Sequence, residues 1–252
     1  MSEGRICIIA GAQKAGTTTL FHWLTTHPQV IPAKKKELHY FDFNYKRGKE
    51  YYLSQFKKKD GIFLLESSPY YLFHPEVPRR IKDQFPKANV VILLRDPIER
   101  AWSQYRMNYN RGIEKLDFRL ALLFESIRTA FSSPDIPESR LQNYSYLSRS
   151  KYCIQIIRWL YYFDRKQLFI AIFEDFYQNP QKGIISICEF LKINSNSIQV
   201  SADILNKGDQ VPMPEHFRNT FGKKIKTDLI QLAKLITPDF GKFETWRTYQ
   251  RL

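Results

Sequence analysis

Residues 11–19 carry the side chains with the clearest chemical meaning in this 252-residue sequence. Gly11 and Gly16 bracket a short loop with a single lysine, Lys14, and three threonines follow the loop. Small residues let several backbone N–H groups approach one ligand, and a helix that begins just after them adds the positive end of its dipole. The segment therefore predicts a site for a phosphate-like anion. Its candidate ligands are Gly11, Gln13, Lys14, Ala15, Gly16, Thr17, Thr18 and Thr19.

The two glycines have the spacing of a Walker A loop, Gly-x-x-x-x-Gly-Lys-Ser/Thr, but the lysine is displaced. In that motif the lysine directly follows the second glycine, whereas here Thr17 does so and the lysine lies inside the loop. A lysine at position 14 can still reach a phosphate oxygen, but the segment is not a good nucleoside triphosphatase loop. An ordinary strand-to-helix turn would also explain the glycines, though not a lysine followed by three threonines.

A buried strand and a helix are expected to hold this loop. Residues 6–10 form an apolar run rich in β-branched side chains, which is typical of a buried strand. The apolar residues of 20–24 recur at helical spacing, and Thr17 or Thr18 is suited to cap that helix. The predicted order is strand, loop and helix.

Further apolar runs alternate with helical patterns along the rest of the chain. Strands that alternate with helices predict a mainly parallel central sheet with helices on both faces. The sequence thus predicts one α/β domain over residues 1–252, with a P-loop-like sheet flanked by helices. The further strands are expected at 62–66, 89–94 and 167–173, and the further helices at 49–57, 75–85, 98–112, 116–127, 146–163, 174–191 and 223–236.

The composition is that of a globular protein with an anionic partner. Hydrophobic residues make up 43% of the chain and charged residues 25%, and the net charge is +14. Such a positive charge favours a nucleotide, a polyanionic polysaccharide, a nucleic acid or a membrane surface as partner. No RNA-binding signature, zinc spacing or recognition-helix pattern accompanies the charge, so nucleic acid is the weaker choice. No charged-then-apolar leader or apolar run of 18 residues is evident, so a soluble, cytoplasmic protein without a membrane span is expected.

Several separated stretches, taken in order, resemble one family. They are GAQKAGTTTLFHWLTTHPQV, KELHYFD, ESSPYYLFHPEVPRRI, VVILLRDPIERAWSQY, SKYCIQIIRWL and FEDFYQNPQKGIISICEFLKI. They resemble the sulfotransferases that use 3′-phosphoadenosine-5′-phosphosulfate (PAPS), and within that family the branch that modifies heparan sulfate. The resemblance implies in-line transfer of the sulfuryl group of PAPS to an acceptor hydroxyl or amine, with adenosine 3′,5′-bisphosphate as the product. No metal is expected, because the loop lacks the Walker lysine–Ser/Thr pair and no carboxylate ends a strand in a clear magnesium-binding context.

The resemblance also assigns residues to the donor. Lys14 and the following Gly-Thr-Thr would hold the 5′-phosphosulfate, with Lys14 neutralising the charge that builds on the leaving phosphate. Arg95 and Ser103 resemble the 3′-phosphate binders, and arginine offers a forked donor suited to phosphate. Tyr152 resembles a position near the adenine, and Lys207 and Gly208 resemble a late loop that closes over the 3′-phosphate.

Each of these residues also has an ordinary structural interpretation. Arg95 could form a surface ion pair with Asp96 or Glu99, and Ser103 could simply lie on a helix face. Tyr152 could cover the core as part of an amphipathic helix. The residues around 207–208 match the family poorly, and the cysteine pair that precedes this loop in the animal heparan sulfate enzymes is missing.

The acceptor must lose a proton before its oxygen or nitrogen can attack sulfur. Glu37, in KELHYFD, matches the family's catalytic glutamate, and His39 is a second candidate base because histidine titrates near neutral pH. If residues 37–41 are extended, these two side chains point the same way. The alternatives are that Glu37 pairs with the lysines at 34–36 and that His39 is a buried, hydrogen-bonded ring.

One departure from the family concerns the reacting centre. The animal heparan sulfate enzymes carry a lysine where this chain has Ser67, so Lys14 acts alone or one of the lysines at 34–36 substitutes. The favoured acceptor is a saccharide, with a small hydroxyl compound, a lipid or a peptide tyrosine left open. Two other functions also remain open, a P-loop kinase-like phosphotransferase and a non-catalytic polyanion-binding module.

Overall fold

A five-stranded sheet forms the centre of the computed structural model, which describes residues 5–57, 63–198, 200 and 211–250. The strand order is β2-β3-β1-β4-β5, and each neighbouring pair runs parallel. Helices cover both faces of parallel strands, which is why the strand interiors are almost continuously apolar and buried. The predicted α/β fold with a central parallel sheet is confirmed. The strands are β1 (Arg5–Gly11), β2 (Val30–Pro32), β3 (Phe63–Ser67), β4 (Asn89–Leu94) and β5 (Leu168–Ile172).

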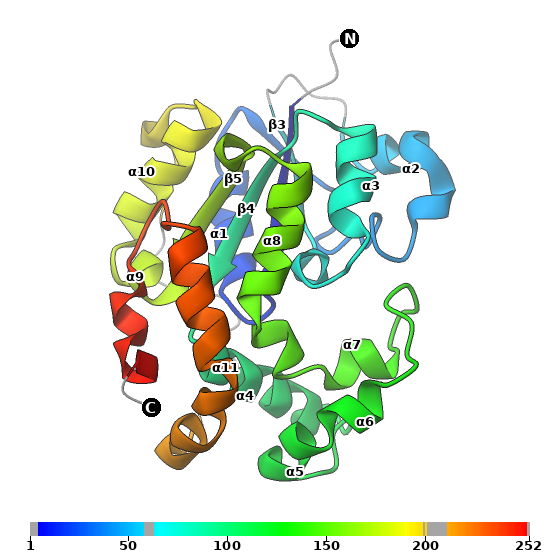
Figure 1. Ribbon diagram of the computed structural model, residues 1–252. Coiled ribbons are helices and arrows are strands. Elements are labelled where there is room, and N and C mark those ends of the chain that lie inside the picture. Colours follow the sequence, from blue (N-terminus) through cyan, green and yellow to red (C-terminus); the bar gives the residue numbers. More distant parts are fainter. Residues whose placement is uncertain (1–4, 58–62, 199, 201–210, 251–252) are drawn as a thin grey trace.

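Helices surround this sheet in two layers (Figure 1). Helices α3, α8 and α11 pack in succession on one face, and α1 contacts β3 from the other. Short 3-10 turns link several elements, among them residues Pro69–Leu72 after β3. The helices are α1 (Thr17–Thr25), α2 (Gly48–Ser54), α3 (Val77–Gln84), α4 (Pro97–Asn110), α5 (Phe118–Leu123), α6 (Glu125–Thr129), α7 (Arg140–Tyr144), α8 (Tyr152–Tyr162), α9 (Phe173–Gln178), α10 (Pro180–Leu191) and α11 (Glu215–Leu235).

Helix α4 leaves the carboxyl end of β4 through a well-formed cap. The carboxylate of Asp96 accepts hydrogen bonds from the backbone N–H groups of Ile98 and Glu99, both at 3.0 Å. Such a cap satisfies donors that have no partner within the first helical turn. Gly112, just beyond the helix, has a φ of 70°, a conformation that favours glycine. The predicted strand at 89–94 is confirmed, and the predicted helix at 98–112 differs by a residue or two at each end.

Other predicted boundaries were wrong for identifiable reasons. Neither Thr17 nor Thr18 caps α1, because Gly16 occupies the cap position with a left-handed φ of 73°. The helix expected at 146–163 starts only at Tyr152. Ahead of it, the buried Glu125 carboxylate binds the backbone N–H groups of Leu147 and Ser148 at 2.6 and 2.8 Å. Ser148–Ser150 form a separate 3-10 turn, and Lys151, with a ψ of 85°, separates this turn from α8.

Four further differences concern two divided helices, one longer helix and one additional strand. The helix expected at 116–127 breaks at Phe124 into α5 and α6, and the helix at 174–191 divides at Pro180, which begins α10. Proline cannot donate the backbone hydrogen bond that a continuous helix requires, so it suits a first helical position. The last helix starts at 215 instead of 223, and the three-residue strand β2 was not expected. Among the described residues, no helix combines the length and apolar character needed to cross a membrane.

Candidate active site

The loop between β1 and α1 is held in shape by its two glycines. A Cβ atom on Gly11 would lie 2.7 Å from Cβ of Leu72, closer than real contacts allow. A Cβ atom on Gly16 would lie 2.5 Å from the Tyr177 ring, and the Tyr177 hydroxyl donates to the Gly16 carbonyl at 2.6 Å. Both positions therefore need glycine, because close packing around them leaves no room for a side chain. The backbone that would face an anion is fixed by its neighbours.

Lys14, in the middle of this loop, lies near several arginine side chains. Its Nζ is 3.9 Å from Sδ of Met107 on α4, and its carbonyl accepts a hydrogen bond from Arg95 Nη1 at 3.0 Å. Partial burial and the neighbouring guanidinium groups, first among them Arg95, lower the pKa of Lys14. A lysine that other cations repel gains more from a bound anion than an isolated lysine does. The local charge thus favours an anion at this loop.

Arg95 follows β4 directly and joins several parts of the site. Besides its bond to the Lys14 carbonyl, its guanidinium pairs with Glu99 at 3.7 Å and lies 5.1 Å from the centre of the Phe173 ring. The expected alternative of an ion pair with Glu99 is thus observed, together with a contact to the anion loop. Ser103 is half-buried on α4, two turns further along. The assignment of these two residues to a 3′-phosphate stays a prediction.

Tyr152 supports Arg95 from inside the protein. Its side chain is fully buried, its hydroxyl donates to the Arg95 carbonyl at 2.8 Å, and its ring stacks on Trp246. The core packing that the sequence analysis gave as the alternative for Tyr152 is thus observed. A position of Tyr152 near the adenine stays a prediction. The predicted ligands Lys207 and Gly208 lie outside the described residues.

A buried arginine beneath the loop was not anticipated. Arg149 donates a short hydrogen bond to Gln13 Oε1, another to the Gln142 carbonyl, and a third to Ser145 Oγ at 2.8 Å. Burial lowers its pKa to about 10, so the guanidinium stays charged at neutral pH. It borders a small pocket with Gln13 and Arg100. The sequence signal was weak, because Arg149 comes just before the SKYC stretch and its partner Gln13 is distant in sequence.

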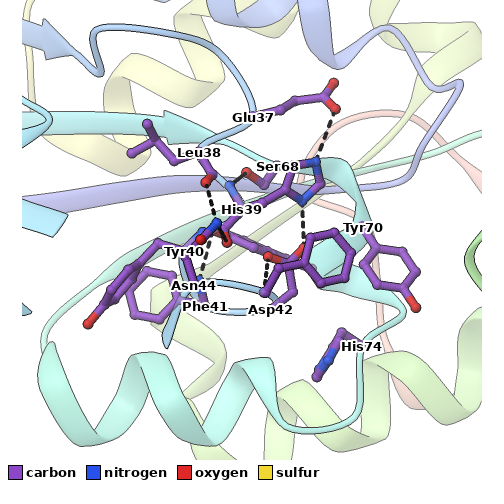
Figure 2. Close-up of polar contacts among 12 residues, drawn as sticks. Glu37, Leu38, His39, Tyr40, Phe41, Asp42, Asn44, Ser68, Tyr70 and His74 are labelled. Atoms are coloured by element: carbon purple, nitrogen blue, oxygen red, sulfur yellow. Dashed lines mark hydrogen bonds and ion pairs between the residues drawn. The ribbon is translucent and has the colours of Figure 1, made fainter. Parts of the chain in front are cut away.

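Next to the anion loop, the candidate site contains three titratable residues in mutual contact, Glu37, His39 and Asp42. His39 lies between two carboxylates, with Nδ1 2.6 Å from Asp42 Oδ2 and Nε2 3.5 Å from Glu37 Oε2 (Figure 2). Residues 37–41 are not extended, because Glu37 and His39 have φ values of 61° and 49°. The side chains of Glu37 and His39 nevertheless meet, through this left-handed turn. Asp42 was missed as a site residue, although the Glu-x-His-x-x-Asp spacing contained the signal.

These contacts set the charges of Glu37 and His39. Burial alone would lower the pKa of His39, but hydrogen bonds to Asp42 and Glu37 raise it to about 9. Burial would raise the pKa of Glu37, yet hydrogen bonds from His39 and Lys36 lower it to about 2. Lys36 Nζ lies 2.6 Å from Glu37 Oε1. At neutral pH the centre is therefore an imidazolium between two carboxylates, with one lysine on Glu37.

A buried carboxyl group on β3 holds the turn that carries these residues. Glu66 accepts hydrogen bonds from the Tyr71 hydroxyl at 2.5 Å and from the Ser68 hydroxyl at 2.9 Å. The Tyr71 hydroxyl in turn accepts from the backbone N–H groups of Tyr40 and Phe41 at 2.8 and 3.1 Å. Ser68 Oγ accepts from the N–H of His39 at 3.2 Å. Three successive backbone groups of the turn are thus tied to the end of β3.

The chain matches the sulfotransferase domain family over residues 5–209, most of its length. It belongs to the sulfotransferase family. The resemblance inferred from the sequence is confirmed, and family and fold together support an enzyme that transfers sulfate. Among the described residues of this sulfotransferase, no group of three or more histidine, cysteine or acidic side chains is arranged to hold a metal ion.

Curated relatives place the sulfotransferase near heparan sulfate enzymes. The Mus musculus bifunctional heparan sulfate N-deacetylase/N-sulfotransferase 4 is 31% identical over 195 residues, which cover 74% of this chain. The Homo sapiens enzyme 3 of the same description is 31% identical over 196 residues, again 74% of the chain. The chain spans only 22% of the length of each of these relatives.

Solved structures agree with the fold. A sulfotransferase from Alicyclobacillus acidocaldarius superposes with a TM-score of 0.80 at 27% identity, over 98% of this chain and 100% of that one. A sulfotransferase domain from the curacin biosynthetic pathway has a TM-score of 0.52 at 16% identity and shares the fold, over 94% of this chain and 99% of that one.

At the position of the family's additional lysine, the sulfotransferase has a small buried side chain. Ser67 is fully buried at the end of β3, and its carbonyl accepts a hydrogen bond from the Glu37 N–H at 2.9 Å. Of the three lysines considered as substitutes, Lys36 reaches Glu37, while Lys34 donates to the Ser54 carbonyl at 2.8 Å. Lys36 is thus the lysine whose contact with the candidate base is observed.

Removing the Tyr71 hydroxyl should loosen the turn and spare the anion loop. In Tyr71→Phe, the N–H groups of Tyr40 and Phe41 lose their acceptor in a buried place, which costs on the order of 1–3 kcal/mol per unpaired group. We expect a lower free energy of unfolding in urea and a reduced kcat, with nearly unchanged nucleotide affinity. Tyr70→Phe is the matched control, because its hydroxyl makes only a 3.4 Å contact with the Pro134 carbonyl. Equal losses in both variants would contradict the anchoring role.

Proposed function

We propose that this protein transfers the sulfuryl group of PAPS to a hydroxyl or amine of a carbohydrate. The observation that supports this most is that the anion loop and the turn with Glu37 and His39 lie at the carboxyl ends of neighbouring strands. The anion loop follows β1, and the turn with Glu37 and His39 is tied to the end of β3, which pairs directly with β1. Open α/β sheets bind ligands at the carboxyl ends of their strands. The carboxylate of Glu37 is close enough to Lys14 to affect its pKa.

On the donor side, the protein contributes positive charge. The N–H groups of the loop and of the first turn of α1 would surround the 5′-phosphosulfate, with Lys14 beside the bridging oxygen. As the S–O bond to that oxygen breaks, negative charge grows on the leaving phosphate, and the lysine stabilises it. Arg95 and Ser103 would bind the 3′-phosphate, and the buried Tyr152 keeps the backbone of Arg95 in place.

On the acceptor side, Glu37 is the better proton acceptor of the two candidates. His39 already carries a proton, because its pKa is raised to about 9, and both ring nitrogens face carboxylates. The imidazolium orients Glu37, and the buried Asp42 fixes the imidazolium. An acceptor that displaces Lys36 would weaken the ion pair that keeps the pKa of Glu37 low, and so make Glu37 a stronger base.

The proposal of a carbohydrate acceptor is based on the names of the relatives and on the net charge of the chain. Heparan sulfate, the substrate in those names, is a polyanionic sugar chain, and a net charge of +14 would attract it. The test is transfer of labelled sulfate from PAPS to a panel of heparan-type oligosaccharides, neutral glycosides and phenols. Transfer to sugars alone supports the proposal. Magnesium-dependent ATP consumption without sulfate transfer would favour a kinase instead.

Nucleotide recognition should depend on the 3′-phosphate. Hydrogen bonds to charged groups contribute on the order of 1.5–3 kcal/mol each. Calorimetry should therefore show adenosine 3′,5′-bisphosphate binding at least about tenfold more tightly than 5′-AMP, a difference of about 1.4 kcal/mol. Arg95→Ala should shrink this preference, while Arg79→Ala, which removes an exposed arginine of α3, should not. Equal affinity of the wild type for both nucleotides would contradict the assignment.

A further inference from the structure

Helices α5 and α6 carry apolar side chains on their outer side as well as on the side that meets the core. Phe118, Ala121 and Leu122 are buried against the protein. The outer side chains remain in solvent. They are Leu120, Leu123, Phe124, Ile127 and Phe131, with exposed fractions of 37%, 46%, 45%, 73% and 110%.

These exposed residues follow one another along α5 and α6. Leu120, Leu123 and Phe124 have the spacing i, i+3 and i+4 that marks one face of a helix. The helix is interrupted at Phe124, whose φ and ψ are −93° and 4°, and Ile127 lies three residues further on, in α6. Together with Phe131 these residues form the outer apolar stripe. A helix that is apolar all round is normally buried, so the stripe is suited to a partner.

Exposed positive charges outnumber exposed negative ones along the segment 111–131, which carries the outer apolar stripe. Glu114 is buried and binds Arg128 at 2.9 Å, and Glu125 is buried against Leu147 and Ser148. These acids therefore contribute little at the surface. The carboxylate of the exposed Asp117 caps α5 through the Leu120 N–H. The basic side chains nearby, in contrast, are exposed: Arg111, Lys115 and Arg119.

We propose that the outer apolar stripe docks on a membrane that contains anionic lipids. Apolar side chains flanked by exposed arginines and lysines bind such interfaces, because the apolar groups enter the acyl boundary and the cations meet the headgroups. Figure 1 shows α5 and α6 at one end of the molecule, away from the sheet, so this end can reach a flat surface first. The complementary charge favours an anionic bilayer over a neutral one.

Docking would also bear on the active site, through α4. Met107 of this helix contacts Lys14, and the helix ends at Asn110, a few residues before the segment that carries the stripe. The membrane would hold the sulfotransferase in one orientation, with the anion loop connected to the docked segment by a single helix. This inference does not depend on the identity of the donor or acceptor.

Co-sedimentation with lipid vesicles tests the proposal. We expect the full chain to bind vesicles of phosphatidylcholine mixed with phosphatidylglycerol, to bind vesicles of phosphatidylcholine alone much less, and to be released by salt. The double variant Leu123→Ser/Phe124→Ser should lower the partition coefficient at least about tenfold. Arg119→Glu should lower it about fivefold or more. The matched control is Ile154→Ser/Ile157→Ser on α8, whose side chains are exposed by 55% and 46%.

Several results would overturn the proposal. One is a wild type that binds neither vesicle type, or both equally. Another is salt-sensitive binding that the stripe variant keeps in full, because charge alone would then explain it. A wild type that forms dimers in sedimentation velocity, ignores vesicles, and becomes monomeric in the stripe variant would assign the stripe to a second copy of the chain. Circular dichroism and thermal melting establish that each variant is folded.

Discussion

Lys14→Ala should reduce sulfate transfer by about 10²–10³-fold at saturating PAPS. The expectation follows from the position of the lysine in the anion loop, where its charge would stabilise the leaving phosphate as the S–O bond breaks. The lysine would stabilise a negative charge that grows only in the transition state, so its loss should lower mainly kcat. Radioactive transfer from PAPS to a sugar acceptor measures it directly.

The variant should remain folded, which makes the kinetic result interpretable. The ammonium group of Lys14 contacts only a thioether among its described hydrogen-bond partners, and the side chain is only half-buried. Alanine also bears a Cβ, so the left-handed φ of 71° costs the variant about as much as the wild type. Lys166→Ala, at an 83% exposed lysine, is the control for loss of one positive charge. Near-normal turnover of Lys14→Ala would show that the loop does not serve the leaving group.

Local sequence patterns predicted the fold well where the residues of an element are sufficient to indicate its secondary structure. The run 89–94 is all apolar after its first residue, and it forms β4 with those bounds. In β2, by contrast, three residues flanked by Pro28 and ending in Pro32 become a strand only through pairing with β3. The contact of Glu125 was equally beyond local prediction. Its carboxylate accepts hydrogen bonds from the N–H groups of Leu147 and Ser148, which lie more than twenty residues further along the chain. Such pairings have no local signal.

The same reasoning explains which parts of the site were predictable. Lys14 and Glu37 lie in short motifs, and the roles predicted for them rest on the residue types in those motifs. Asp42 is three residues from His39, and a left-handed turn that no local pattern indicated brings the two together. Arg149 meets Gln13 across most of the chain, so only the folded structure could pair them.

The pH dependence of stability should reflect the pair formed by Glu37 and His39. The carboxyl pKa falls from 4.5 to about 2, so its contribution is present above pH 4.5 and is lost as the pH falls through 2. The imidazole pKa rises from 6.5 to about 9, so its contribution is full below pH 6.5 and is lost as the pH rises through 9. Thermal melting of the wild type and of His39→Asn across this range checks both signs.

Glu37→Gln should lower turnover by about 10²–10⁴-fold, the usual contribution of a general base. The amide keeps the shape of the side chain but cannot accept the acceptor's proton. Affinity for adenosine 3′,5′-bisphosphate should hardly change, because Glu37 faces the acceptor side. Any change should be toward tighter binding, since a negative charge near Lys14 has been removed.

His39→Asn is the control that separates the base from the residue that orients it. We expect a milder loss of turnover, together with a shift of the acid side of the kcat–pH profile to higher pH. The shift follows because the hydrogen bond from His39 lowers the pKa of Glu37, and removing it lets that pKa rise toward 4.5. A purely structural histidine would lower activity without moving the profile. If Glu37→Gln kept near-normal turnover while His39→Asn were inactive, the base would be His39, and Glu37 would be the ion-pair partner of Lys36.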